Sequence, residues 1–497
     1  MYTLQDYYKA AGLKHPVAFA KHLQLSFAPW KHQVVGLRRL LKYDTWGLYD
    51  DPATGKTLTA QAYSLFWVSE GQKVLWIMPP SLLGQWRESF SENFIGLDTQ
   101  VNVEIFNGSP AKRKKQVERW QRGSVPPVLG VGYQLFTRGA WKDFRKWGYK
   151  VVVMDEAHKV KNAESNIFKI IDQHFSDGNL VPMTGTPLHR ELKDTYTLIK
   201  MTNPAAYRSY DHFSRAHFLY RKVKFKQPKI AKNGRRIYGF KDHYGYQGEA
   251  KIAKALYHRA SRVIRKDAMD IKDPQIVEVP VTLDPKHKAL YKKLMRERIL
   301  ELSDGELITA LTEVELRQKA LQIVTCPELF VPEGEKIVNE VAKCAADLLD
   351  GCGIWQSKAI MFLHYRQSVQ AFAEHFKEYN PALMYGGSNT EKNRKKFLDD
   401  DSCRLLIANV KSAGEGFNFQ YVSNTIIYPE PTSVPGDFKQ SMERVVRKGQ
   451  EREVNVYVLK ALNTVAVKAT KVMLERQQVV RRVNQDSSTF LDYFQVA

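Results

Sequence analysis

A chain of 497 residues is too long for one ordinary hydrophobic core, so the sequence predicts two or three domains. Hydrophobic residues make up 43% and charged residues 26%, which is typical of a globular protein and excludes a fibrous or low-complexity chain. The formal charge of +22, from 75 Lys and Arg against 53 Asp and Glu, favours a polyanionic partner such as nucleic acid.

The distribution of charges and cysteines disfavours secreted and membrane proteins. The first twenty residues include Asp6, Lys9, Lys14 and His15 and hold no apolar stretch like that of a signal peptide. No window approaches the roughly 18 uninterrupted apolar residues of a membrane helix. The four cysteines lack C-x-x-C spacing, which disfavours a zinc site and a disulfide framework. We therefore expect a reduced, cytoplasmic protein without membrane contact.

Short apolar runs bounded by turn residues recur along the chain and predict buried parallel strands. In the first half these runs are residues 74–78, 128–131 and 151–154. In the second half they are residues 359–363, 405–408, 425–428 and 454–458. Amphipathic stretches that suit crossover helices separate the runs, so the pattern predicts two α/β units.

The middle of the chain, residues 206–345, has a different composition. Between Arg221 and Lys266 there are fifteen Lys and Arg against two acids, interleaved with aromatic residues. Apolar residues follow helical spacing around Leu290, Tyr291 and Leu294, and again at Leu307, Leu311 and Val314. We interpret this region as mostly helical, basic insertions that project from the two lobes.

These patterns predict a domain organisation with four parts. They are a first lobe over residues 1–205, its basic insertion over 206–270, a helical linker and insertion of the second lobe over 271–345, and the second lobe over 346–497. The second lobe is expected to end in a helix over residues 465–483.

The strongest local motif is Asp50-Asp51-Pro52-Ala53-Thr54-Gly55-Lys56-Thr57, followed by a helix-compatible stretch. Backbone amides of such a loop cradle nucleotide phosphates at a helix N-terminus. Lys56 would contact the β- and γ-phosphates, and the Thr57 hydroxyl would bind Mg²⁺. Because Asp50 replaces the first glycine of G-x-x-x-x-G-K-T, an ordinary surface turn remains the alternative on this motif alone.

A pair of acids, Asp155 and Glu156, follows the predicted strand 151–154. That position is the C-terminal edge of a parallel sheet, where α/β proteins place their ligands. Asp155 would hold Mg²⁺ through water, and Glu156 would orient and deprotonate the attacking water. A D-E pair can also cap a helix. The two motifs together nevertheless predict ATP hydrolysis.

These motifs resemble those of Swi/Snf-type ATPases of helicase superfamily two. The family's phosphate loop is D-E-M-G-L-G-K-T, so Asp50 matches, whereas Pro52, Ala53 and Thr54 depart from it. The run from Asp155 to residue 162 closely follows D-E-A-H-R-I-K-N, and residues 184–188 are similar to T-G-T-P-L. The resemblance implies two RecA-like lobes in tandem, with ATP hydrolysed in the cleft between them.

The resemblance also assigns roles to residues of the first lobe. It implies that Asp51, Thr54 and Gly55 line the ATP site and that Gln33 contacts adenine. Residues 79–86 are similar to P-x-S-L-L-x-x-W. With the threonine that opens the T-G-T-P-L segment, they imply nucleic-acid contacts at Ser81, Trp86 and Thr184.

In the second lobe, three segments continue the resemblance. Residues 358–365 resemble K-x-L-I-F-x-x-Y, residues 412–418 resemble S-x-x-A-G-G-x-G-x-N, and residues 440–450 follow Q-A-x-x-R-x-x-R-x-G-Q. They imply that Gly416 contacts ATP and that Ser412 contacts nucleic acid. Arg444 and Arg447, three residues apart on one helical face, are expected to reach the γ-phosphate and stabilise the charge of phosphoryl transfer. An R-x-x-R pair alone is also common on exposed basic helices.

The resemblance implies a monomeric translocase on double-stranded DNA, including forked or branched DNA, that depends on ATP and Mg²⁺. The short format resembles compact bacterial or phage members of the family, which implies the cytoplasm of a bacterium or a phage-infected cell. One alternative is a helicase that unwinds or anneals strands at forks or recombination intermediates. Another is a remodeller that displaces a DNA-bound protein such as RNA polymerase. A pure binding module would leave the ordered set of Lys56, Glu156 and Arg447 unexplained.

The basic segment between Arg221 and Lys266 is expected to lie along the DNA. Its charges suit phosphate contacts, and its interleaved aromatic residues suit packing or stacking on a strand. The alternative is that the aromatic residues pack the insertion onto the first lobe while the charges are solvated. Within this segment, the residues expected to contact DNA are Lys224, Lys226, Arg235 and Arg236.

Overall fold

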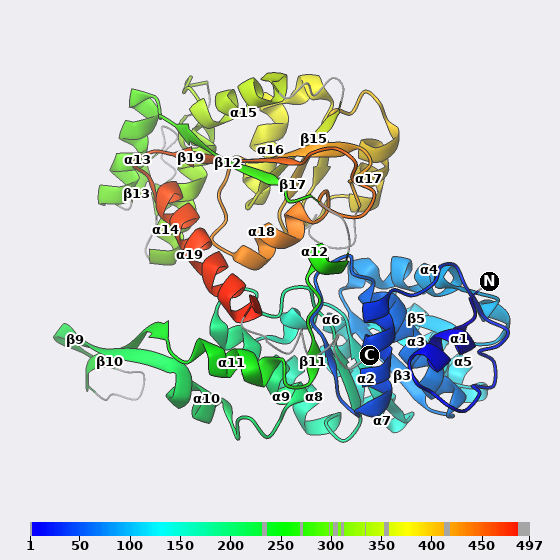
Figure 1. The fold of residues 1–497 in the computed structure, drawn as a ribbon. Coiled ribbons are helices and arrows are strands. Elements are labelled where there is room, and N and C mark those ends of the chain that lie inside the picture. The colour runs from blue at the N-terminus through cyan, green and yellow to red at the C-terminus, as the bar shows by residue number, and fades with distance from the viewer. Residues whose placement is uncertain are drawn as a thin grey trace. The chain divides into compact units, whose positions relative to one another are not determined.

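The computed structural model describes residues 2–230, 236–268, 272–297, 299–301, 307–309, 313–332, 334–351, 357–411 and 418–485. Contacts between residues divide the chain into two compact units. Unit one comprises Met1–Ile264 and the chain from Val479 onward, and unit two comprises Arg265–Gln478 (Figure 1). In the parts of the chain that are described, no helix is long and apolar enough to cross a membrane.

A five-stranded parallel sheet forms the centre of unit one, with strand order β5-β6-β3-β7-β8. Its strands are β3 (Lys73–Met78), β5 (Val103–Phe106), β6 (Val128–Gly132), β7 (Tyr149–Met154) and β8 (Asn179–Pro182). Beyond β8, the short strand β2 (Gly47–Leu48) joins through isolated bridges, and β11 (Ala260–Ser261) pairs in parallel with β2. The strands predicted at 74–78, 128–131 and 151–154 are confirmed.

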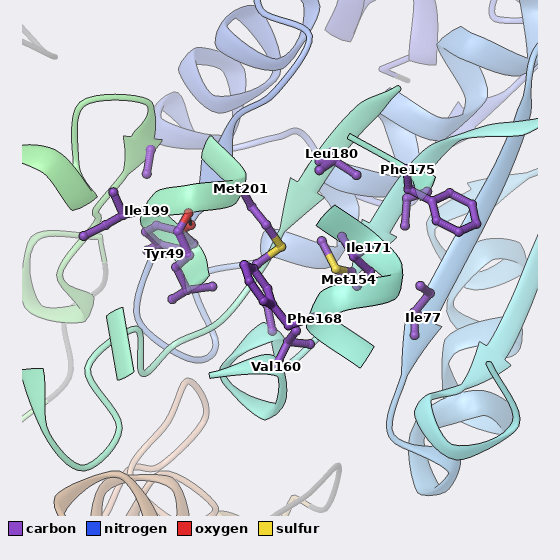
Figure 2. Packing of buried hydrophobic residues seen from close by; sticks show 14 of the residues in the cluster. Tyr49, Ile77, Met154, Val160, Phe168, Ile171, Phe175, Leu180, Ile199 and Met201 are labelled. Carbon is purple, nitrogen blue, oxygen red and sulfur yellow. Dashed lines mark hydrogen bonds between the residues drawn. The ribbon is translucent and has the colours of Figure 1, made fainter. Parts of the chain in front are cut away.

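Hydrophobic clusters cover both faces of this sheet. Along β3, Leu75 and Ile77 belong to one cluster, whereas Val74 and Trp76 belong to the other, as the alternation of a strand requires. Figure 2 shows the first cluster, in which Ile77 lies with Met154 and with apolar residues of α8. The helices of unit one are α1 (Leu4–Ala10), α2 (Lys31–Lys42), α3 (Lys56–Ser69), α4 (Leu83–Asn93), α5 (Pro110–Arg122), α6 (Tyr133–Leu135), α7 (Trp141–Lys146), α8 (Asn166–His174), α9 (Tyr196–Thr202), α10 (Tyr210–His217) and α11 (Glu249–Leu256).

The basic insertion of unit one contains a long antiparallel hairpin, where the sequence had suggested mostly helices. Strand β9 (Phe218–Ile230) pairs with β10 (Arg236–Tyr246), with two irregularities in register (Figure 1). The charged side chains alternate with aromatic and β-branched residues, which favour strands. Lys224 and Lys226 lie on β9 and Arg236 lies on β10, whereas Arg235 falls outside the described residues.

The base of the hairpin is an aromatic cluster. Ring centroids of Phe218 lie 4.7 Å from His243 and 5.2 Å from Tyr246, and the rings of Tyr220 and His243 lie 6.0 Å apart. The hydroxyl of Tyr246 donates to Glu191 Oε2 at 3.0 Å. Aromatic residues therefore pack the base onto unit one, as the alternative interpretation of this segment proposed.

Unit two is built on a six-stranded parallel sheet with strand order β12-β19-β18-β15-β17-β16. The strands are β12 (Gln275–Val281), β15 (Lys358–Leu363), β16 (Ala382–Met384), β17 (Leu405–Asn409), β18 (Ser423–Tyr428) and β19 (Asn455–Ala461). The predicted strands of the second half are confirmed. Its helices are α12 (Arg265–Ala268), α13 (Pro285–Glu297), α14 (Glu313–Thr325), α15 (Glu340–Gly351), α16 (Arg366–His375), α17 (Thr390–Asp399), α18 (Pro435–Met442) and the start of α19 (Val465–Gln485).

One predicted helix in the middle region is wrong. Leu307 lies in β14 (Leu307–Thr309), which pairs with β13 (Ile299–Glu301), and α14 begins only at Glu313. Three apolar residues are too few to distinguish the period of a helix from that of a strand. Pairing with β13 makes residues 307–309 a strand. Leu311 falls outside the described residues. The other helical pattern is confirmed by α13, and the predicted closing helix by α19.

Candidate ATP site

The phosphate loop connects β2 to α3, and its backbone includes two left-handed residues. Gly55 precedes the first residue of α3 with φ 80°, and a Cβ at this position would lie 2.2 Å from Gln33 Nε2. The positive φ favours glycine there, and any other residue would also displace the end of the Gln33 side chain. Ala53 has φ 66°, a conformation that L-residues adopt at a cost, and the family pattern has glycine at this position. Ala53 therefore holds a strained backbone position in the loop.

Lys56 is held by the loop it belongs to. Its ammonium donates to the carbonyl oxygens of Asp50 at 2.8 Å and Asp51 at 2.9 Å. Burial lowers the pKa of Lys56, and the nearby carboxylates of Asp50 and Glu156 partly oppose that shift. The Lys56 ammonium thus lies near the acids of the phosphate loop and near the acid pair that follows β7. It is also at the N-terminus of α3, where phosphate binding is favoured.

The N-terminus of α2 is attached to the same loop. Gln33 Nε2 donates to the Gly55 carbonyl at 3.0 Å, while its Oε1 accepts from the Trp30 amide at 2.7 Å. The imidazole of His32 donates from Nε2 to the Thr54 carbonyl at 2.7 Å. The structure therefore places Gln33, Thr54 and Gly55 together. The adenine contact of Gln33 stays a prediction.

The acid pair lies directly after β7, as predicted. The Asp155 amide donates to the Ile77 carbonyl at 2.9 Å, and Tyr133 donates its hydroxyl to the Asp155 carbonyl at 2.7 Å. Glu156 has φ 52° and ψ 47°, a left-handed conformation that is costly for a non-glycine residue and occurs often at functional sites. Its amide donates to Asp155 Oδ1 at 2.9 Å. These contacts fix the acid pair at the sheet edge.

The D-E-A-H and T-G-T-P-L segments are joined through His158. Its Nδ1 lies 3.1 Å from Glu156 Oε2 and 3.2 Å from Thr184 Oγ1, with which it forms a hydrogen bond. The His158 ring also stacks on His189, with centroids 4.6 Å apart. A Cβ on Gly185 would lie 2.4 Å from the Pro52 ring, so this segment also touches the phosphate loop. The three motifs of unit one therefore form one connected group.

Two residues predicted to contact nucleic acid have buried side chains, and their contacts stay predictions. Thr184 is 0% exposed, and its hydroxyl accepts from the Thr186 amide, so it shapes the T-G-T-P-L loop from inside. Trp86 is 4% exposed, with ring centroids 5.6 Å from Trp76 and 5.4 Å from Phe90. The side chain of this tryptophan thus packs α4 onto the central sheet. Ser81, by contrast, is exposed, and its role stays a prediction.

The arginine motif of unit two lies outside a helix, which corrects the expectation of one helical face. Helix α18 ends at Met442, and turns follow. The Arg444 carbonyl accepts from the Phe419 amide at 2.9 Å, and the Val446 carbonyl accepts from Arg265 at 2.7 Å. Both carbonyls therefore bond to partners from outside the turn.

The guanidinium of Arg447 donates to the side-chain oxygen of Asn418. Burial, together with the nearby charge of Arg444, lowers the pKa of Arg447 to about 10. Arg447 therefore stays charged at neutral pH. Gly416 and Ser412 fall outside the described residues, so their predicted roles stay predictions.

Several residues that shape the site were missed by sequence reasoning. His189 directly follows T-G-T-P-L, so its position beside that motif was a usable signal. Tyr133 and Arg262 come from distant parts of the chain, and no spacing connects them to the motifs. Arg262 forms an ion pair with Asp51 of the phosphate loop, with Nη2 2.8 Å from Oδ1.

Comparison with known families agrees with this geometry. The model described as the SNF2-related domain matches residues 32–329, which is more than half of the chain. The chain belongs to the SNF2-related family. A second model, the helicase conserved C-terminal domain, matches residues 342–449. This SNF2-related protein is thus an ATPase of helicase superfamily two, as the motifs implied.

Individual relatives are distant. The uncharacterized ATP-dependent helicase YqhH of Bacillus subtilis is 22% identical over 499 residues, covering 95% of this chain and 82% of that protein. The ISWI chromatin-remodeling complex ATPase ISW1 of Saccharomyces cerevisiae is 22% identical over 468 residues, covering 89% of this chain but 39% of that protein. Among solved structures, the Sulfolobus solfataricus SWI2/SNF2 ATPase core in complex with dsDNA matches with TM-score 0.40 and 20% identity, covering 94% of this chain and 95% of that one.

Proposed function

We propose that this SNF2-related ATPase is a translocase on double-stranded DNA that uses ATP hydrolysis to remodel DNA or protein–DNA complexes. The observation that carries the proposal is the connected group of three motifs in unit one. His158 joins the acid pair to Thr184, and Gly185 lies against Pro52 of the phosphate loop. A change at the phosphates can therefore be passed through direct contacts to the T-G-T-P-L segment.

In this proposal the ATP site divides its chemistry among charged groups. Lys56 binds the β- and γ-phosphates, and Glu156 orients the attacking water and accepts its proton. Arg447, with Arg444, stabilises the charge that develops on the transferred phosphoryl group. Asp51, Thr54 and Gly55 of the phosphate loop line the ATP site, and Gln33 contacts adenine.

The residues present fit Mg²⁺. This ion takes one or two protein oxygen ligands together with phosphates and water. Thr57 lies in the first turn of α3, and Asp155 follows β7, so a hydroxyl and a carboxylate are available from adjacent motifs. Bound Mg²⁺ would neutralise charge on the phosphates. Removal of Mg²⁺ with a chelator should therefore abolish hydrolysis.

Double-stranded DNA is the proposed partner because the chain has a net positive charge and because a relative is named as a DNA helicase. The chain carries a formal charge of +22, and Lys224, Lys226 and Arg236 belong to the strands of the hairpin β9–β10. A relative from Arabidopsis thaliana, 21% identical over 85% of this chain, bears the name ATP-dependent DNA helicase DDM1. Lysines on such a ribbon suit phosphate contacts, which carry no base information.

The hairpin also favours a second candidate function. A projecting two-stranded ribbon is a shape that can be inserted between strands at a fork, so a helicase that separates or anneals strands is the alternative. The two functions differ in the nucleic acid that activates hydrolysis.

The test is ATPase stimulation by an intact duplex, a forked duplex and a single strand of equal length. The translocase proposal predicts strong stimulation by the intact duplex and weak stimulation by the single strand. Stimulation by forks alone, with unwinding of the fork, would replace it with the helicase. A protein that hydrolyses ATP equally with and without any DNA would contradict both.

A further inference from the structure

The segment of residues 259–263, the return segment, brings the chain back from the basic insertion to the phosphate loop. It runs parallel to the strand that leads into the loop, with Ala260 opposite Gly47 and Ser261 opposite Leu48. Three backbone hydrogen bonds join the two segments. The donors and acceptors are Gly47 N and Arg259 O at 2.9 Å, Tyr49 N and Ser261 O at 3.1 Å, and Asp51 N and Val263 O at 2.8 Å.

Both acids that open the phosphate loop are bound by this segment. Asp50 Oδ1 accepts from the Val263 amide at 2.9 Å. Arg262 extends one nitrogen, Nη2, to Asp51 Oδ1 at 2.8 Å and donates from the other, Nη1, to the Tyr49 carbonyl at 2.7 Å. The carboxylate of Asp50, which stands where the usual pattern has its first glycine, thus anchors the return segment.

The pair of Arg262 and Asp51 is almost fully removed from water. The two side chains are 6% and 9% exposed. Burial alone would lower the pKa of Arg262, but the adjacent Asp51 carboxylate raises it above its ordinary value. Removing one partner of a buried pair leaves an uncompensated charge, so the geometry of the loop depends on both residues.

The same stretch of chain is attached to the T-G-T-P-L segment at its other end. Strand β10 ends at Tyr246, whose hydroxyl donates to Glu191 Oε2 at 3.0 Å, just beyond that segment. Helix α11 follows, and the return segment comes directly after it. A displacement of the hairpin β9–β10 can thus act on the ATP motifs from two sides.

We propose that Arg262 is a positioning residue of the ATP site, which fixes the path of the phosphate loop and makes that path depend on the hairpin β9–β10. The first part needs only ATP binding. The second part rests on the proposed function, because it assumes that the hairpin contacts DNA. A purely structural ion pair would lower stability without changing how the loop binds nucleotide.

The experiment compares four purified full-length proteins without DNA: wild type, Arg262→Gln, Asp51→Asn and the double variant. Each single variant should raise the KM for ATP by about 10- to 100-fold, the usual effect of losing a group that orients a binding element. Added ADP should raise the Tm of the wild type more than that of either variant. Because the residues act through one another, the double variant should show a KM close to that of a single variant rather than the product of both effects.

Two further variants control for charge and for folding. Lys254→Gln removes an exposed charge on α11, eight residues before Arg262, and it should leave the KM unchanged. Arg262→Lys keeps the charge but cannot donate to Asp51 and Tyr49 as a planar fork does, so it should restore part of the affinity. If Arg262→Gln does not fold, the comparison of Arg262→Lys with wild type still decides the question.

An unchanged KM in Arg262→Gln or Arg262→Lys, with a lower Tm, would show a structural pair and overturn the proposal. Effects of the single variants that multiply in the double variant would also overturn it. For the second part, the ratio of ATPase rates with and without duplex DNA should fall in Arg262→Lys. If the wild type itself shows no stimulation by DNA, the proposed function fails, while the KM results still decide the role of Arg262.

Discussion

The phosphate loop of unit one and the arginine turn of unit two, residues 444–447, are held in different ways. In the loop, side chains from α2 and the return segment bind both carbonyls and carboxylates, as His32, Gln33 and Arg262 show. In the arginine turn, the contacts from Phe419 and Arg265 are made to backbone carbonyls. Groups that bind the ground state thus lie in a preformed cradle. The residues expected to act on the transition state are anchored by their backbone, and the Arg447 side chain also donates to Asn418.

The largest effect on hydrolysis is expected from substitutions in unit one, at the catalytic carboxylate and the lysine of the phosphate loop. Glu156→Gln should lower kcat by about 10⁴-fold, the upper range for a general base, because the amide cannot accept a proton from water. Nucleotide binding should persist, as measured by the rise in Tm on addition of ADP. Lys56→Ala should lose both turnover and that rise.

Glu164→Gln is the matched control, since this carboxylate is exposed and lies eight residues after Glu156. It should hydrolyse ATP at the wild-type rate. A Glu156→Gln variant with near wild-type turnover would assign the catalytic carboxylate to another residue.

Arg447→Ala tests the arginine turn of unit two. It should lower kcat by about 10³-fold, at the lower end for an arginine that stabilises phosphoryl transfer, and change the KM for ATP by only a few-fold. Steady-state kinetics over a range of ATP concentrations separates the two constants. An unchanged kcat in Arg447→Ala together with an inactive Arg444→Ala would exchange the roles of the two arginines.

The hairpin β9–β10 differs from both regions because it is expected to act on DNA rather than ATP. Reversal of Lys224, Lys226, Arg235 and Arg236 to Glu should leave DNA-free hydrolysis intact and raise the DNA concentration for half-maximal stimulation by about tenfold. Each phosphate contact contributes roughly −0.9 to the slope of log K against log salt, so the slope should also become shallower.

The control for this variant reverses Lys112, Lys114 and Lys115, which are exposed basic residues on α5. That variant should respond to DNA much as the wild type does. Equal responses of the hairpin variant and the wild type would show that the hairpin is structural and that the motif loops alone hold the duplex.

The smallest effect concerns the strained alanine of the loop. Ala53→Gly should raise the free energy of unfolding of unit one by about 1 kcal/mol, because a left-handed residue costs an L-amino acid roughly 1–2 kcal/mol and glycine loses part of that gain as entropy. Differential scanning calorimetry would detect it as a rise in Tm of a few degrees. Ala62→Gly, in the interior of α3, should lower Tm instead. A lower Tm for Ala53→Gly would show that this methyl group packs favourably.

The sequence predicted those parts of the fold and site that depend on short segments. Apolar runs such as residues 151–154 are long enough to identify buried strands, and the acids that follow β7 mark the edge of the sheet. The hairpin β9–β10 was not predicted, because its alternation of lysine and aromatic residues was interpreted as a charged, helical insertion. Strand β8, with four residues ending in Pro182, carries too short a pattern to be recognised.

Tertiary contacts account for the features of the site that the sequence did not predict. Trp86 and Thr184 lie within motifs that suggested nucleic-acid contact, yet burial of both side chains follows from packing that no motif encodes. The pairing of Arg262 with Asp51 joins residues far apart in the chain, so spacing gives no indication of it. The turn that holds Arg444 depends on Phe419 and Arg265 in the same way.

The most direct test of translocation is displacement of a third strand from a triplex built at the end of a long duplex. The wild-type protein with ATP should release the third strand while leaving the duplex paired, and Glu156→Gln should bind the same DNA without releasing it. Release of the third strand by Glu156→Gln, or no release by a wild-type protein that hydrolyses ATP on the duplex, would contradict translocation on double-stranded DNA.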